Sequence, residues 1–321
     1  SGVLIMDKCA DLLPDHFRFV KGVVDSADFS LNISREVLQH TRQLKVIASA
    51  LEKKIKGELL AMQKEDREKY EKFWAAFGTQ LKYGVVSDYG THKDVLQDLL
   101  LFWSSKEEKN TTLAAYKDRM PEDQPFYYYA CGESVEKIAK LPQVERILDK
   151  GYEILYCTED VDDFVMKALA EIDGKKFKSA TEEDALPQTE EEKKANQEKA
   201  EAGKSVLEAV KEALGGQVKE VRVSSILKSG ACCLSADGPV SIEMERYMRK
   251  VEGGQPMKAE RVLELNADAA PFAALKKAVE TGDKDTVAKY SKLLYAQALL
   301  LAGLPLEDPA EYTELVCSLM I

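Results

Sequence analysis

The chain has 321 residues, and its 45 basic and 56 acidic side chains give a net charge of −11. This length is enough for two or three domains. The acidic balance argues against a nucleic acid or an anionic membrane as the main partner. No apolar run approaches the roughly 20 residues that cross a bilayer, and we expect neither a membrane span nor a signal peptide.

The chain opens on a strand-like apolar run, residues 3–6, with almost nothing before it. A strand needs neighbours to pair with, so we expect the chain to be part of a longer protein.

Residues 22–39 form a polar, turn-rich loop that leads into a long helix and places Arg35 and Gln39 one helical turn apart. The planar guanidinium of an arginine can grip a phosphate through two hydrogen bonds. On spacing alone, a surface ion pair of Arg35 with Asp25 or Glu36 is the more ordinary role.

Three amphipathic helices are predicted next: from Ser34, a suitable N-cap, to about Met62, after Asp66, and from near Thr91. Apolar side chains recur in them at steps of three and four residues. Their aromatic stripes are typical of helix-packing surfaces. We interpret residues 20–103 as a compact helical connector.

The pattern then changes to alternating strands and helices. The strands are predicted at 126–130, 152–157 and 176–179, and the helices at 133–149 and 161–172. This alternation predicts a small parallel sheet covered by helices. The turn after the first strand lacks the glycine spacing of a phosphate-binding loop, so no nucleotide site is assigned there.

A charged segment, residues 181–204, contains hardly any large apolar side chain and is predicted to be a solvated linker. A third unit follows it. Its predicted elements are a helix at 205–214, strands near 218–224, 231–235 and 262–266, a helix at 242–250, and two or more terminal helices.

The terminal helices are unusually apolar. The first, over 286–302, is apolar on more than one face and is broken by Gly303-Leu304-Pro305. Asp308, Pro309 and Glu311 then provide the N-cap, first and third positions of a last helix. Burial within their own domain is one solution, and a symmetric bundle with a second copy is the other.

The six cysteines and three histidines are scattered, without a Cys-x-x-Cys pair. They are Cys9, Cys131, Cys157, Cys232, Cys233, Cys317, His16, His40 and His92. No subset has the spacing of zinc ligands, so no metal site is predicted. We expect buried, reduced thiols, with a vicinal disulfide between Cys232 and Cys233 as the alternative.

The string from Gly22 to Gln39 resembles the middle-segment signature of the heat-shock protein 90 chaperones. Further motifs recur in the same order along the chain. They are Phe17-Arg18-Phe19-Val20-Lys21, Lys72-Phe73-Trp74, Ala76-Phe77, Arg119-Met120-Pro121, Tyr128-Tyr129, Gly132-Glu133-Ser134, Thr158-Glu159-Asp160, Leu293-Leu294-Tyr295 and Ala298-Leu299-Leu300.

The resemblance implies a multi-domain α+β chain that holds the later part of the middle segment and the C-terminal dimerisation domain. The implied parts are the final strand and helix of the large middle subdomain (1–20), the catalytic loop and helical connector (21–103), a small α/β subdomain (104–182), a charged linker (183–204) and the dimerisation domain (205–321). The N-terminal ATPase domain is not among them.

The resemblance also implies roles for individual residues. Arg35 and Gln39 match the residues that complete the ATPase when the dimer closes, with Arg35 neutralising charge on the γ-phosphate. They would act on ATP and magnesium held by the N-terminal domain of the full-length parent. We therefore expect neither a cofactor nor ATPase activity in this chain alone.

Phe164, Met244 and Met248 match the client-binding surface of the family. The two methionines share one helix face, and flexible thioethers suit a surface that accepts many apolar segments. On pattern alone, filling the core of their own domain is the more ordinary role of the two methionines, and the resemblance favours client contact. The dimer interface is assigned to Leu293, Leu294, Leu300, Leu315, Leu319 and Ile321.

The expected partners are unfolded or partly folded client proteins and a second copy of the chain, with no nucleic acid and no membrane. The chain ends on Ser318-Leu319-Met320-Ile321 and not on the acidic Met-Glu-Glu-Val-Asp tail of the eukaryotic cytosolic members. This points to the bacterial branch of the family and a cytoplasmic location.

Two rival functions remain open. The small α/β unit could be an independent enzyme, although it shows no nucleophile–base constellation, phosphate loop or metal cluster in its sequence. The chain could also be an assembly scaffold whose only activity is dimerisation.

Overall fold

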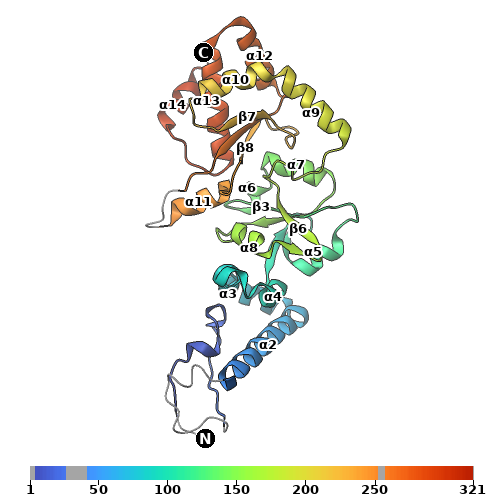
Figure 1. Cartoon of the computed structure of the whole chain (residues 1–321), viewed down its shortest axis with the longest axis vertical. Coiled ribbons are helices and arrows are strands. Elements are labelled where there is room, and N and C mark those ends of the chain that lie inside the picture. Colours follow the sequence, from blue (N-terminus) through green and yellow to red (C-terminus); the bar gives the residue numbers. More distant parts are fainter. Residues whose placement is uncertain (1–3, 27–41, 252–256, 321) are drawn as a thin grey trace. The chain divides into compact units, whose positions relative to one another are not determined.

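The computed structural model describes residues 4–26, 42–251 and 257–320. The chain divides into two compact units. The first comprises residues 1–102, 110–119 and 164–170, and the second comprises 103–109, 120–163 and 171–321. The fold is mixed α+β, as the sequence predicts (Figure 1).

The first unit is built around two long helices, α2 (Arg42–Glu65) and α3 (Arg67–Val86). Asp66 separates them and caps α3, because its carboxylate accepts a hydrogen bond from the Lys69 backbone N–H at 3.0 Å. The shorter elements are η1 (Ala10–Leu12), η2 (Asp15–Phe17), η3 (Ser87–Gly90), α4 (Lys93–Leu96), η4 (Gln97–Leu99) and α5 (Leu113–Arg119).

An aromatic cluster joins the N-terminal residues to α3. The ring of Phe19 lies 5.1 Å from that of Phe73 and 4.9 Å from that of Phe77. The buried Tyr70 hydroxyl donates a hydrogen bond to the Leu99 carbonyl at 2.5 Å. The prediction that the aromatic stripe is a packing surface is confirmed.

One sheet has six strands in the order β2-β1-β4-β3-β6-β5, and its strands β3, β4, β6 and β5 belong to the second unit. The strands β3 (Tyr127–Cys131), β4 (Ile154–Cys157) and β6 (Lys175–Ser179) are parallel. Strand β1 (Leu101–Ser104) pairs with β4, and β5 (Glu171–Ile172) pairs with β6, both in the antiparallel sense. The predicted parallel sheet is thus its centre, while β1, β2 (Lys109–Thr112) and β5 were not predicted.

A three-stranded sheet lies wholly in the second unit and has the order β7-β9-β8, with β7 (Glu220–Val223), β8 (Cys232–Ala236) and β9 (Arg261–Leu265). Leu263 and Leu265 of β9 belong to an apolar core. Helices α10 (Lys204–Ala213), α12 (Ala270–Thr281) and α13 (Lys284–Leu301) contribute further residues to this core (Figure 1).

Glu264 lies between Leu263 and Leu265 and is fully buried. Its carboxylate accepts hydrogen bonds from Ser224 at 2.7 Å and Ser235 at 2.6 Å and pairs with Arg222 at 3.1 Å. Because strand residues alternate between faces, this sheet has one apolar face and one face with a polar network around Glu264.

Two local expectations are wrong. Among described residues 4–20 there are 3-10 turns and not a strand and a helix. The helix expected over 133–149 is two helices, α6 (Val135–Ile138) and α7 (Pro142–Asp149). Pro142 has no N–H to donate and occupies the first turn of α7, so it starts a helix and cannot continue one.

The segment predicted to be a solvated linker contains α9 (Glu190–Ala202), none of whose residues is buried. Thr189 and Glu192 form a capping box at its start. With few apolar contacts, this capping and the helix propensity of its Glu, Lys and Ala residues support it locally.

All six cysteines are free, so the vicinal disulfide is excluded. Four are buried, Cys9 is half-buried and Cys317 is exposed, which corrects the expectation of uniformly buried thiols. Burial raises the pKa of Cys232 to about 12 and the pKa of Cys233 well above its usual range. Both thiols are therefore protonated and unreactive.

None of the helices in the described ranges combines the length and the apolar character that crossing a bilayer requires.

Candidate functional site

Helix α11 (Ile242–Lys250) carries the two methionines predicted to meet clients. Ser241 caps it by accepting a hydrogen bond from the Met244 backbone N–H at 3.2 Å. Acidic residues occupy its first turn and basic residues its last turn, as the helix dipole favours. The predicted bounds of this helix are confirmed.

A buried ion pair fixes α11 to the sheet. The Glu245 carboxylate is fully buried and accepts hydrogen bonds from Arg261 Nη2 at 2.6 Å, the Ala259 backbone N–H at 3.0 Å and Arg249 Nη2 at 2.9 Å. Burial by itself would raise the pKa of Glu245, but the hydrogen bonds from these three partners outweigh it and the pKa is lowered.

Two arginines link α11, β9 and α13. Arg261 Nη1 donates to the Tyr295 hydroxyl of α13 at 2.6 Å. Arg246 Nη1 donates to the Ala302 carbonyl at the C-terminal end of α13 at 3.4 Å, where a cation is favourable.

On the same helix, Ile242 and Glu245 are buried, whereas Met244 and Met248 lie one turn apart and are half-buried.

A groove of about 260 Å³ lies beside α11 in the second unit. Ile138 and Leu141 line it, together with Ile242 and the end of α13. Leu300 and Leu301 at that end are 50% and 40% exposed. The groove is therefore an apolar surface bordered by α11.

The last helix, α14 (Pro309–Cys317), starts as predicted, with Asp308 accepting a hydrogen bond from the Glu311 backbone N–H at 2.9 Å. Lys292 Nζ of α13 lies 2.5 Å from Glu311 Oε1. No residue of α14 is buried, although Tyr312, Leu315 and Val316 are apolar. In a single chain these three side chains are half-buried, so the apolar face of α14 is covered only in part.

The other predicted site residues are placed as follows. Phe164 lies half-buried on α8 (Asp162–Leu169), in the first unit, whereas Met244 and Met248 belong to the second. Leu293 and Leu294 are each 5% exposed, inside the core of their own unit, and Leu319 is 53% exposed. Arg35, Gln39 and Ile321 lie outside the described residues.

Sequence reasoning missed a polar cluster in the first unit, formed by His16, Glu52 and His92. These residues are separated by 36 and 40 positions in the chain. No linear spacing could reveal them, because ligand motifs are recognised only when their members share one short segment.

Comparisons with known proteins agree with the motifs. The family model described as Hsp90 protein matches residues 1–321. Proteins named "Chaperone protein HtpG" from Bacillus subtilis (strain 168) and Clostridium perfringens (strain ATCC 13124) are each 54% identical, over 321 and 320 residues, and that from Clostridium botulinum (strain Langeland) is 53% identical over 320 residues. Each match covers 100% of this chain and 51% of the relative, so the chain spans about half the length of these relatives. The chain belongs to the Hsp90 family.

Proposed function

We propose that this chain is the client-binding and dimerising part of an ATP-dependent molecular chaperone. The observation that carries the proposal is the family match over the whole chain, together with relatives named as HtpG chaperones. Because the chain spans about half of those relatives, the complete chaperone cycle belongs to the longer protein.

The proposed client-contacting residues are Phe164 in the first unit and Met244 and Met248 in the second. Each is apolar and half-buried, so each keeps accessible area. Glu245 and Arg261 hold α11 rigidly, which lets its methionine side chains adapt without moving the helix.

A triple variant, Phe164→Ala with Met244→Ala and Met248→Ala, should suppress the aggregation of a model unfolded protein several-fold less than the native chain. Light scattering during thermal aggregation of the client measures this. Met257→Ala is the matched control, because Met257 is an exposed methionine outside α11. Full suppression by a folded triple variant would remove these three residues from the client site.

In this proposal the dimer interface is formed by the exposed Leu300 of α13, the half-buried Leu315 of α14 and the exposed Leu319 that follows α14. Burying a leucine fully contributes on the order of 1.5–3 kcal/mol, before association costs are subtracted. A second copy related by a two-fold axis would cover α14 with the same surface.

Leu315→Asp should strongly weaken the dimer, because it places a charge without a partner in an apolar contact. Multi-angle light scattering at tens of micromolar gives the mass. Leu148→Asp is the control, since Leu148 is a 36% exposed leucine on α7. If the native chain has the mass of a monomer at this concentration, the proposed dimer through α13 and α14 is wrong.

Arg35 and Gln39 are proposed to act on nucleotide held by the N-terminal domain of the full-length parent. Arg35→Ala in the full-length parent should lower ATP turnover with little change in ATP affinity, because the contact forms mainly in the closed state. This chain alone should show no turnover above a buffer blank. A collapse of ATP affinity would instead make Arg35 a ground-state ligand.

The scaffold alternative makes a different prediction for the same variants. If dimerisation is the only activity, the triple client-site variant should match the native chain in every assay. Loss of aggregation suppression with an intact dimer decides for the chaperone.

A further inference from the structure

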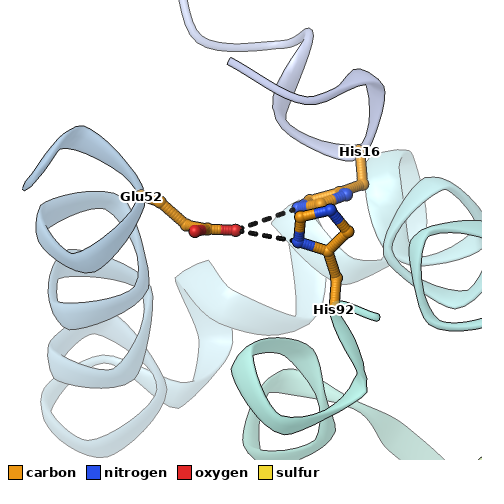
Figure 2. A group of neighbouring side chains, drawn as sticks. All are labelled: His16, Glu52 and His92. Carbon is orange, nitrogen blue, oxygen red and sulfur yellow. Dashed lines mark hydrogen bonds and ion pairs between the residues drawn. The ribbon is translucent and has the colours of Figure 1, made fainter. Parts of the chain in front are cut away.

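The cluster of His16, Glu52 and His92 draws on three segments of the first unit. His16 belongs to η2, Glu52 to α2, and His92 is the N-cap residue of α4. Glu52 Oε1 lies 3.2 Å from His92 Nδ1 and 3.9 Å from His16 Nε2. Figure 2 shows both imidazole rings turned toward the same carboxylate oxygen.

Packing fixes the donor atoms before any ion arrives. His16 is 4% exposed, and its ring lies 4.5 Å from the ring of Phe17 and 4.9 Å from that of His92. Gly84 allows η2 to approach α3, because a Cβ at that position would meet His16 Cβ at 2.6 Å. A preformed set of ligands loses little conformational entropy on binding.

The cluster is also accessible. The side chains of Glu52 and His92 are 21% and 26% exposed. A cavity of about 630 Å³ in the same unit is lined by His16 and His92 together with the polar residues Asp15, Gln80 and Ser87. His92 and Glu52 are thus the accessible side of the cluster, whereas His16 Nε2 is buried behind them.

The spacing of the donor atoms suits a tetrahedral metal ion. Zinc holds nitrogen and oxygen ligands at about 2.0–2.2 Å, which places tetrahedral ligands about 3.3 Å apart. All three ligand atoms lie within 4.8 Å of one another, and two of the separations are 3.2 and 3.9 Å. Small side-chain adjustments would bring them to the zinc geometry.

We propose that His16, Glu52 and His92 bind a divalent transition-metal ion of the zinc type. Two imidazoles and one carboxylate form the donor set of zinc sites that keep a fourth position for water. That position would face the cavity. Imidazole nitrogens favour zinc, cobalt and nickel over magnesium and calcium, whose preferred ligands are oxygens.

A simple structural clamp is the competing explanation. A hydrogen bond between His92 and Glu52 would by itself tie α4 to α2, and it does not require His16 Nε2 to be directed at the same oxygen. A bound ion uses all three residues and would cross-link η2, α2 and the start of α4. Metal binding should therefore stabilise the first unit as a whole.

Isothermal titration calorimetry of the full chain with zinc chloride tests the proposal, and visible absorption on adding cobalt chloride reports the coordination geometry. We expect one equivalent to bind, with the intense bands of tetrahedral cobalt, and magnesium chloride to give no heat. His92→Ala and Glu52→Gln should each weaken zinc binding by about 100-fold or more, because loss of a ligand exceeds the 10–100-fold typical of outer-shell changes.

Controls separate this site from other zinc-binding side chains. His40→Ala removes the third histidine, and Cys9→Ala with Cys317→Ser removes the two cysteines that are not buried. Both should leave the zinc affinity unchanged. Circular dichroism verifies that each variant is folded, and Glu52→Gln preserves the shape of the site. Absence of zinc binding, or equal affinity in the native chain and the Glu52→Gln variant, would overturn the proposal.

Discussion

Each unit contains a charged cluster that joins a helix to segments distant in the sequence. The two clusters differ in how many of their polar atoms have close hydrogen-bond partners. In the second unit, Glu245 is surrounded by Arg261, Arg249 and the Ala259 backbone at 2.6–3.0 Å, and it is fully buried. In the first unit, Glu52 faces two histidines at 3.2 and 3.9 Å beside a cavity. A closed ion pair holds a structure in one arrangement, whereas partly exposed donor atoms leave room for a ligand.

The strongest test of this comparison is Arg261→Met. It removes the main partner of a fully buried carboxylate, so the free energy of unfolding of the second unit should fall by about 3–5 kcal/mol. Trp103 reports on the second unit and Trp74 on the first, so a Trp74→Phe background isolates the relevant fluorescence. Denaturation in urea gives the value.

Arg249→Ala is the matched control for that experiment. Arg249 also bonds Glu245, but its side chain is 45% exposed, so its loss should cost less than about 1 kcal/mol. If the two substitutions lower the free energy of unfolding equally, the burial of Arg261 does not make its ion pair with Glu245 stronger than that of Arg249.

A second test uses pH. The pKa of Glu245 is lowered in the folded chain, so its charged form stabilises the fold above the unfolded pKa, and this contribution disappears as the pH falls through the folded value. Glu245→Gln should lose about 1–3 kcal/mol at pH 7 and show a smaller loss of stability on acidification than the native chain. Urea denaturation at several pH values between neutral and acid measures both. An unchanged acid dependence would contradict the assignment.

The smallest effect is expected in the first cluster. Glu52→Gln in metal-free buffer should lower the free energy of unfolding of the first unit by about 1 kcal/mol or less, because Glu52 and His92 are partly exposed and water can reach them. A Trp103→Phe background leaves Trp74 as the reporter. If Glu52→Gln lowers the free energy of unfolding as much as Arg261→Met does, the two clusters do not differ in their access to water.

The elements that depend on local chemistry were predictable. The bounds of α11, the Asp66 cap of α3 and the Asp308–Glu311 start of α14 follow from side chains that bond their own backbone. The strands β3, β4 and β6 follow from short apolar runs between turns. Pro142 also signals the break between α6 and α7. A single helix was expected there because apolar residues recur at helical spacing on both sides of Pro142.

The candidate site was predictable only in part. The methionine face of α11 is visible in the sequence, but its rigidity depends on Arg261, which comes from β9 and has no signal that marks it as a partner of Glu245. Leu293 and Leu294 were assigned to the dimer interface with Leu300, yet they lie inside their own core. An amphipathic pattern shows that a helix has an apolar face and does not show what covers it.

The sequence by itself determined the family, the mixed α+β class, and most helices and strands, because these depend on motifs, periodicity and capping within short segments. Only the tertiary structure decided which charged residues meet. Glu245 with Arg261, and His16 with Glu52 and His92, are brought together by packing between elements 16 to 40 residues apart. These contacts form because the burial of many apolar side chains fixes the positions of the elements. The sequence around each charged residue therefore contains no signal that identifies its partner.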